Sequence, residues 1–103
     1  MRSLCAIVIV ALLSAACRGE TVSVKYLGAL DLSGYTCTTI TRRSFIRRVC
    51  YEGIAKSMVI ELGLTYYAYC DLGPETEKAL MAADSMGRYY NSSIKGRFSC
   101  RQK

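Results

Sequence analysis

A cluster of arginines is the feature of this sequence best suited to binding a ligand. The stretch TRRSFIRR supplies this arginine cluster, which consists of Arg42, Arg43, Arg47 and Arg48. A guanidinium group offers a planar fork of donors that matches phosphate and carboxylate oxygens. Because neighbouring residues of a strand point to opposite faces, only part of the cluster can act together if it lies on a strand. The cluster predicts an anion site, and solvated arginines that protect a strand edge are the alternative interpretation.

Tyrosines form a second group that could contact a ligand. In TYYAYC, Tyr67 and Tyr69 share one face of an expected strand, and Arg88, Lys95 and Arg97 could extend a basic site from the expected second helix. Exposed tyrosines beside basic residues would form a stacking platform for single-stranded nucleic acid. The chain has no tryptophan and only two phenylalanines, so tyrosines must also fill its core. We therefore expect Tyr67 and Tyr69 to pack inside the domain, with ligand stacking as the alternative.

Catalytic residue types are scarce in this chain. There is no histidine, which excludes triads and dyads built on imidazole and removes a common metal ligand. The acids of the expected first helix and its surroundings are favoured on the surface by the helix dipole, and they are Asp71, Glu75, Glu77 and Asp84. The glycines Gly28, Gly34 and Gly53 are isolated and form no phosphate loop. We expect a protein that is not an enzyme and that has neither a metal nor a cofactor.

Residues 1–19 have the pattern of a signal peptide. An arginine precedes the continuous apolar run LCAIVIVALLSAA, which is too short to span a bilayer and ends in small residues. We favour cleavage that leaves Glu20 first; cleavage before Cys17 and a lipoprotein with an acylated Cys17 are the alternatives. Removal of this segment lowers the net charge from +6 to +4, a mild excess that favours anionic surfaces. We therefore expect a periplasmic or secreted protein.

The cysteines that remain after this segment are Cys37, Cys50, Cys70 and Cys100. An even number of cysteines in a small exported chain is typical of disulfides, and each bridge would add roughly 2–4 kcal/mol to a domain with a marginal core. A zinc site would need close pairs of ligands, whereas these cysteines lie 13, 20 and 30 positions apart. We expect two disulfides.

The hydrophobic pattern predicts an α+β domain that is built from a three-stranded antiparallel meander and two helices. Alternation places Val22, Val24 and Tyr26 on one side of an N-terminal strand, and a connecting arm follows it. Met86, Tyr89, Tyr90 and Ile94 are the residues of the second helix expected to face the core. The expected ranges are 21–26 for the N-terminal strand, 27–39 for the arm, 44–51, 58–62 and 65–70 for the meander, and 74–83 and 86–95 for the helices.

This layout restricts the disulfide pairing. Cys50 and Cys70 would end the first and third strands of the meander, which places them roughly 10 Å apart. A disulfide tolerates Cα separations only up to about 7 Å, so a bridge between these two is disfavoured. Cys37–Cys50 with Cys70–Cys100 remains open, and so does Cys37–Cys70 with Cys50–Cys100.

Three stretches follow one another in an order that resembles a known family. The first matches S-x-I-x-x-V-x-Y at Ser44, Ile46, Val49 and Tyr51. The second matches Y-x-Y at Tyr67 and Tyr69. The third matches A-x-S-x-G-x-Y-Y-N-x-x-I at Ala83, Ser85, Gly87, Tyr89, Tyr90, Asn91 and Ile94. Together they resemble the KTSC domain, a family named for a segment at the C-terminus of some lysyl-tRNA synthetases and also found as small stand-alone bacterial proteins.

The resemblance implies a KTSC-like domain over residues 44–98, after a strand and arm at 20–43 and before a tail at 99–103. The function of the family is unknown, and RNA binding has been suggested because of the synthetase association. Where the family commonly has Val-Pro after Y-x-Y, this chain has CDLGP, and Cys50 replaces a small residue. Both departures fit disulfide use, as in an exported member.

We expect an exported, non-enzymatic binding module with a mildly basic arginine and tyrosine surface. Its partner would be an anionic surface or a protein. An RNA-binding domain is one alternative, which export disfavours because cellular RNA lies in another compartment. A small envelope structural protein or lipoprotein is the other.

Overall fold

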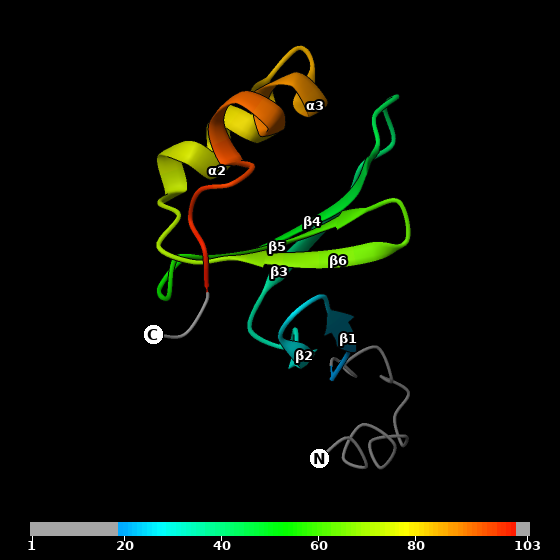
Figure 1. Cartoon of the computed structure of the whole chain (residues 1–103), viewed down its shortest axis with the longest axis vertical. Coiled ribbons are helices and arrows are strands. Elements are labelled where there is room, and N and C mark those ends of the chain that lie inside the picture. The colour runs from blue at the N-terminus through cyan, green and yellow to red at the C-terminus, as the bar shows by residue number, and fades with distance from the viewer. Residues whose placement is uncertain (1–18, 101–103) are drawn as a thin grey trace, which may run out of the picture.

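The computed structural model describes residues 19–100 of the chain. The expected signal peptide, with Cys17, lies outside the described residues except for Gly19, and so does the end of the C-terminal tail. The described part is a mixed α+β structure in which helices cover one face of a β-sheet (Figure 1).

The sheet has six strands in the order β2-β1-β6-β5-β4-β3. All neighbours are antiparallel except β1 and β6, which run parallel and pair only at Val24 and Tyr66. The expectation of a three-stranded meander was therefore inexact, because the meander β4–β5–β6 forms only the middle of a larger sheet. The strands are β1 (Thr21–Val24), β2 (Gly28–Asp31), β3 (Thr36–Thr39), β4 (Ile46–Glu52), β5 (Ser57–Leu62) and β6 (Thr65–Tyr69).

The prediction that residues 27–39 form only a connecting arm is wrong, because this segment contains β2 and β3. Strand β2 folds back on β1 as a hairpin, and β3 pairs along β4 with Cys37 opposite Cys50. The first strand also ends earlier than predicted, at Val24 rather than at residue 26. Val24 is buried, but Tyr26 has a φ of 71° and is 86% exposed, because the chain has already turned towards β2.

The meander itself is confirmed. Gly63 has a φ of 64°, a left-handed conformation that glycine adopts without strain, so Gly63 and Leu64 can close the tight turn between β5 and β6. The pairing of β4 with β5 shifts register between Ile46 and Arg48, as at a β-bulge. This shift leaves Ile46 buried while Arg48 points to the opposite face of the sheet.

Two helical segments follow β6, as predicted. Helix α2 (Pro74–Ala82) begins at its proline, and α3 (Met86–Tyr89) continues directly into the π-helical turn η3 (Tyr90–Ile94). Ser85 caps α3 by accepting a hydrogen bond from the backbone N–H of Arg88. No helix among the described residues is long and apolar enough to cross a membrane.

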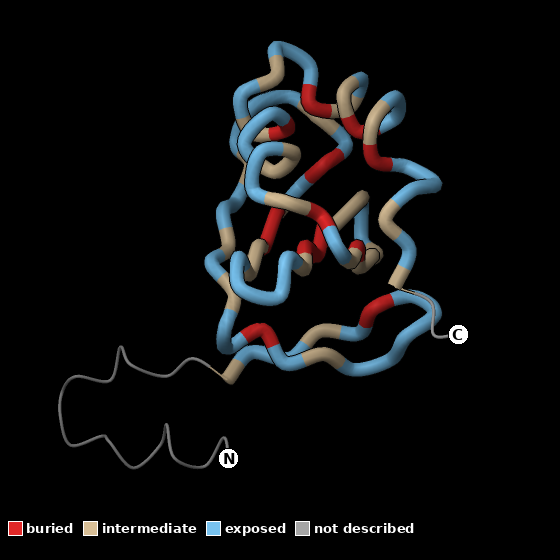
Figure 2. The backbone as a smooth tube through the Cα atoms, turned by 90° about the vertical axis from the view of Figure 1, so that its left-hand side faces the viewer, coloured by how far each residue is buried: buried red, intermediate tan, exposed pale blue. Residues whose placement is uncertain are grey.

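The meander separates two clusters of buried side chains, one on each face. The larger cluster joins the helices to the sheet and contains Ile46, Val49, Met58, Ile60, Tyr69, Leu72, Leu80, Met86, Tyr90 and Ile94. The smaller cluster lies beneath the N-terminal hairpin and contains Val24, Leu32, Cys50 and Val59. Figure 2 shows buried positions of the helices and of the sheet facing one another. The predicted core side of the second helix is confirmed, with Tyr89 only partly buried.

The disulfides are Cys37–Cys50, with Cα atoms 3.9 Å apart, and Cys70–Cys100, with Cα atoms 4.9 Å apart. This is one of the two pairings that the sequence left open. The first bridge links directly opposite residues of β3 and β4, and the second fastens the C-terminal tail to the end of β6. Two disulfides in one small domain are typical of a non-cytoplasmic environment.

Tyr69 and Tyr90 share a hydrogen bond between their hydroxyl groups inside the larger cluster. The oxygens are 2.5 Å apart and the rings meet edge to face. Burial raises the pKa of Tyr69 far above its usual value, and the bond to Tyr90 adds to the shift. Both rings therefore pack inside the domain, as the sequence predicted for Tyr69, and the Tyr69 hydroxyl remains protonated at physiological pH.

Removal of one hydroxyl from this pair should destabilise the protein more than removal of both. Tyr69→Phe leaves the Tyr90 hydroxyl buried without its partner, which should lower the free energy of unfolding by about 1–2 kcal/mol. The double variant with Tyr90→Phe should recover most of that loss. Urea unfolding of the single and double variants measures both values. A double variant that loses the sum of the two single effects would show that the hydroxyls act independently.

Candidate binding groove beside strand β6

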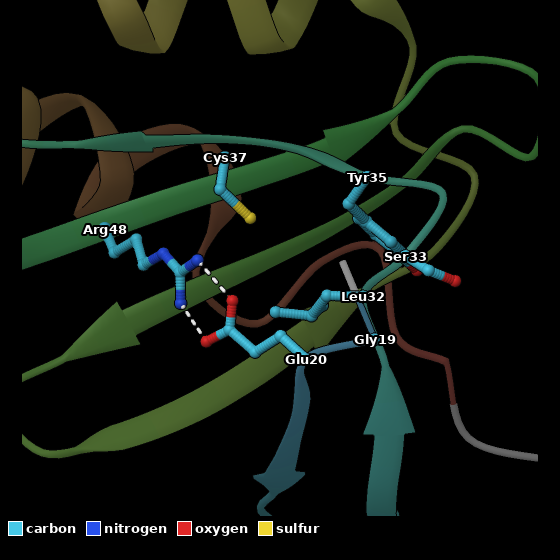
Figure 3. Close-up of a pocket in the computed structure, with 7 residues that line it drawn as sticks. All are labelled: Gly19, Glu20, Leu32, Ser33, Tyr35, Cys37 and Arg48. Carbon is cyan, nitrogen blue, oxygen red and sulfur yellow. Dashed lines mark hydrogen bonds and ion pairs between the residues drawn. The ribbon is translucent and has the colours of Figure 1, made fainter. Parts of the chain in front are cut away.

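Arg48 of the predicted anion site is already bound within the protein. It donates two hydrogen bonds of 2.7 Å to the carboxylate of Glu20 (Figure 3). It donates a third, of 3.1 Å, to the hydroxyl of Tyr66. These bonds lower the pKa of Glu20 and raise that of Arg48. A pocket of about 410 Å³ lies beside the pair. Arg48 therefore holds the beginning of the described chain against the sheet, on the face that carries Tyr66.

The other members of the arginine cluster do not meet the predicted tyrosines. Arg42 donates to the carbonyl oxygen of Met81 at 3.2 Å, so it lies beside α2. Arg43, Arg47 and the separate Arg88 are exposed. Within residues 19–100, no hydrogen bond or cation–π contact joins any of these arginines to Tyr67 or Tyr69. The arginines of the predicted site therefore have other partners or lie exposed, and the described contacts do not join them to Tyr67 and Tyr69.

Tyr67 and Tyr69 line a groove of about 720 Å³ along the outer edge of β6, which is the edge that faces away from β5. We call it the β6-edge groove. Its other residues come from the turn between β1 and β2 and from the tail after η3. They are Lys25, Tyr26, Leu27, Ala68, Gly96, Arg97, Ser99 and Cys100.

The turn between β1 and β2 forms one side of the groove. Strand β1 runs beside β6 only as far as Tyr66, whose carbonyl accepts a hydrogen bond of 2.9 Å from the backbone N–H of Lys25. The chain then reverses, because Tyr26 and Gly28 both adopt positive φ values, 71° and 93°. This reversal carries Lys25, Tyr26 and Leu27 away from the sheet, and no strand of the described residues lies beside the next part of the β6 edge.

The C-terminal tail forms the other side of the groove. Gly96 has a φ of 79°, which ends the helical segment and turns the chain back to the sheet. The backbone N–H of Cys70 donates to the carbonyl of Phe98 at 2.8 Å, and the Cys70–Cys100 disulfide fixes the same contact. The tail is therefore attached to β6 at two adjacent points, which positions Arg97 at the groove.

The groove combines aromatic rings with positive charge. Lys25 places its Nζ 5.3 Å from the centre of the Tyr26 ring, a cation–π contact, and Arg97 comes from the opposite segment. Tyr26 is 86% exposed and Leu27 is 50% exposed. Among the described residues that line the groove, none is acidic. Such a surface can bind an anionic partner through ion pairs at its sides and apolar contact along its floor.

The comparisons with known proteins agree with the motif order read from the sequence. The model of the KTSC domain family matches residues 43–98, more than half of the chain. The chain belongs to the KTSC domain family. The crystal structure of a KTSC domain protein from Yersinia pestis is similar in fold, with a TM-score of 0.59 and 23% sequence identity over 67% of this chain and 97% of that one. No curated protein matches this chain in sequence.

The residues that the KTSC model matches form only part of the groove. Tyr67, Tyr69 and Arg97 lie inside the matched range, whereas Lys25 and Tyr26 lie before it. Sequence reasoning missed Lys25 as a site residue and assigned Tyr26 to the inward side of a strand. Gly28 was the available signal, since a glycine two positions after a tyrosine permits a tight turn there. Arg97 was noted only as an extension of the arginine site.

Proposed function

We propose that this KTSC protein is an exported, non-enzymatic binding module that holds an anionic partner in the β6-edge groove. One observation carries the proposal: three tyrosines and two cations line a groove of about 720 Å³ to which the described chain contributes no acidic side chain. Tyrosine rings offer large contact area at low entropic cost, and their hydroxyls can meet polar groups. The two disulfides support the assignment to a non-cytoplasmic compartment.

Charge reversal within the groove should remove binding to an anionic polymer. We expect Lys25→Glu with Arg97→Glu to weaken the affinity for heparin about tenfold, because each exposed ion pair contributes up to about 1 kcal/mol and reversal adds repulsion. Retention on a heparin column, measured across a salt gradient, reports this change.

The control is Arg43→Glu with Arg47→Glu, which changes the net charge by the same amount on exposed residues outside the groove. This variant should elute close to the wild-type protein. If it lost retention while the groove variant kept it, the arginine cluster would be the binding surface and the groove assignment would be wrong.

Binding of single-stranded nucleic acid is the second candidate function, and the aromatic and basic lining of the groove favours it. Fluorescence anisotropy with single-stranded RNA and DNA, measured across a salt series, tests this candidate. Affinity that falls steeply with salt and depends on Tyr67 would support it. Absence of binding at low salt would exclude it.

Export is supported by the disulfides and by the sequence of residues 1–19. Mass spectrometry of the mature protein distinguishes a chain that begins at Glu20 from one that begins at a free or acylated Cys17. An acylated Cys17 would favour the third possibility, a small envelope lipoprotein. A chain that retains Met1 and is recovered from the cytoplasm would contradict export.

A further inference from the structure

We infer that the partner in the β6-edge groove is an acidic peptide segment in an extended conformation, which pairs its main chain with Ala68. The inference rests on the proposed function and specifies the chemical class of its ligand. Three features carry it: the direction of the backbone groups of Ala68, the interruption of the sheet edge at this residue, and the positive charge on both sides.

The direction of the Ala68 backbone groups follows from its neighbours. In an antiparallel pair, successive residues direct their N–H and C=O groups to alternate sides of the strand. The carbonyl of Tyr66 and the N–H of Cys70 both bond to segments on the outer edge of β6, namely to Lys25 and to Phe98. Ala68 lies midway between them and therefore directs its N–H and C=O to the same edge, into the groove that it lines.

Among residues 19–100, the outer edge of β6 is thus covered on both sides of Ala68 and has no neighbouring strand at Ala68 itself. Strand β1 pairs with β6 only at Tyr66, and the tail joins at Cys70. Within the described chain, no strand pairs with the outer edge at Ala68. A backbone donor and acceptor on an open strand edge form the minimal template for an added strand, and main-chain pairing of this kind binds peptides in many domains.

The charge of the groove selects among peptides. Lys25 and Arg97 belong to the two segments that flank the β6 edge, and no acid lines the space between them. Alternate side chains of an extended peptide point to the same side, at intervals of roughly 7 Å. A peptide with acidic residues at alternate positions could place carboxylates near the cations while its intervening apolar residues contact Leu27 and Tyr67.

A peptide fits this arrangement better than a single-stranded nucleic acid does. Stacking of successive bases needs several accessible ring faces, but Tyr69 is only 7% exposed and its hydroxyl is bound to Tyr90. A nucleic acid has no amide main chain to pair with the N–H and C=O of Ala68. Tighter binding of RNA than of the peptide would therefore contradict the inference.

The test measures fluorescence polarisation of a short labelled peptide of alternating glutamate and valine. The full-length mature protein should bind it, and Lys25→Glu with Arg97→Glu should weaken binding about tenfold. The same peptide with N-methylated amides keeps its charge and loses main-chain donors, so it should bind about fivefold more weakly. Because the methyl groups are on the ligand, this comparison does not depend on the folding of any variant.

Ala68→Pro provides a matched change in the protein. It removes one N–H at a position where no described strand pairs with this side of β6, so no hydrogen bond of the sheet is lost and proline is tolerated. It should weaken the unmodified peptide about fivefold, because the Ala68 N–H no longer donates to a peptide carbonyl. It should weaken the N-methylated peptide by a similar factor, because that peptide keeps its carbonyl acceptors. Circular dichroism and the mass of both disulfides verify that the variant is folded.

The outcomes separate this inference from the proposed function. If heparin binds in the groove but the acidic peptide does not, or if N-methylation has no effect, the peptide inference is overturned and the anionic groove remains. If single-stranded RNA binds more tightly than the peptide through the groove, the ligand class is nucleic acid. If neither heparin, RNA nor the peptide responds to the groove variant, the proposed function is itself wrong.

Discussion

Replacement of Cys70 and Cys100 by alanine should lower the free energy of unfolding by about 3–4 kcal/mol. The bridge closes a loop with a sequence separation of 30 residues, and loss of the cross-link returns that loop's entropy to the unfolded chain. The folded state should also lose order locally, because the disulfide lies beside the backbone hydrogen bond from Cys70 to Phe98 and holds the tail at the end of β6 together with it. Since the tail carries Arg97, the variant should bind heparin more weakly as well.

Guanidinium chloride unfolding and the heparin assay measure these two consequences. The comparison variant replaces Cys37 and Cys50, whose separation is 13 residues and which belong to the opposite side of the meander. It should lose about 3 kcal/mol of stability and keep its heparin affinity. Equal loss of binding in both variants, under conditions in which both remain folded, would contradict the assignment of the tail to the binding site.

Leu80→Ala should cost about 3 kcal/mol, within the range measured for truncation of a fully buried leucine. Leu80 is the one buried residue of α2 and has 0% exposure. The helix has nine residues, too few for independent stability in water, and its N-cap residue Gly73 provides no side-chain cap. Leu80 is therefore the main buried contact of α2, beside the partly buried Met81. Hydrogen exchange should report early opening of α2 in the variant.

The neighbouring Lys78 provides the control for this substitution. It is exposed on the same helix, so Lys78→Ala should change the stability by no more than about 0.5 kcal/mol. Thermal unfolding of the two variants gives the comparison. If Leu80→Ala proved as mild as Lys78→Ala, the other contacts of α2 would be sufficient to hold it and the packing account would need revision.

The meander and the helices could be predicted because their signals are local. Pro74 and Gly96 mark helix ends, and the alternation of Met58, Ile60 and Leu62 marks a buried strand face. The four-residue strands β2 and β3 carry no comparable pattern. GALD and TCTT contain few apolar residues, and β3 depends on pairing with β4 along its length. A strand of this kind is defined by its partner, which a local pattern does not reveal.

The candidate site could be predicted only in part for the same reason. Tyr67 and Tyr69 were identified from their spacing, but the groove combines them with a turn and a tail that lie far away in the sequence. The arginine cluster was the most visible basic feature, yet Arg48 is bound by Glu20, 28 positions earlier. Lys25 and Arg97 look ordinary as single residues. Their significance comes from their placement on the two sides of one strand edge.

The most direct test of the central claim, that an anionic partner binds in the β6-edge groove, is an NMR titration of the uniformly ¹⁵N-labelled mature protein with a heparin oligosaccharide. We expect the largest amide shifts at Lys25, Tyr26, Tyr67, Ala68 and Arg97, and we expect these shifts to saturate together. Shifts confined to the arginine cluster and α3, with the groove unchanged, would contradict it.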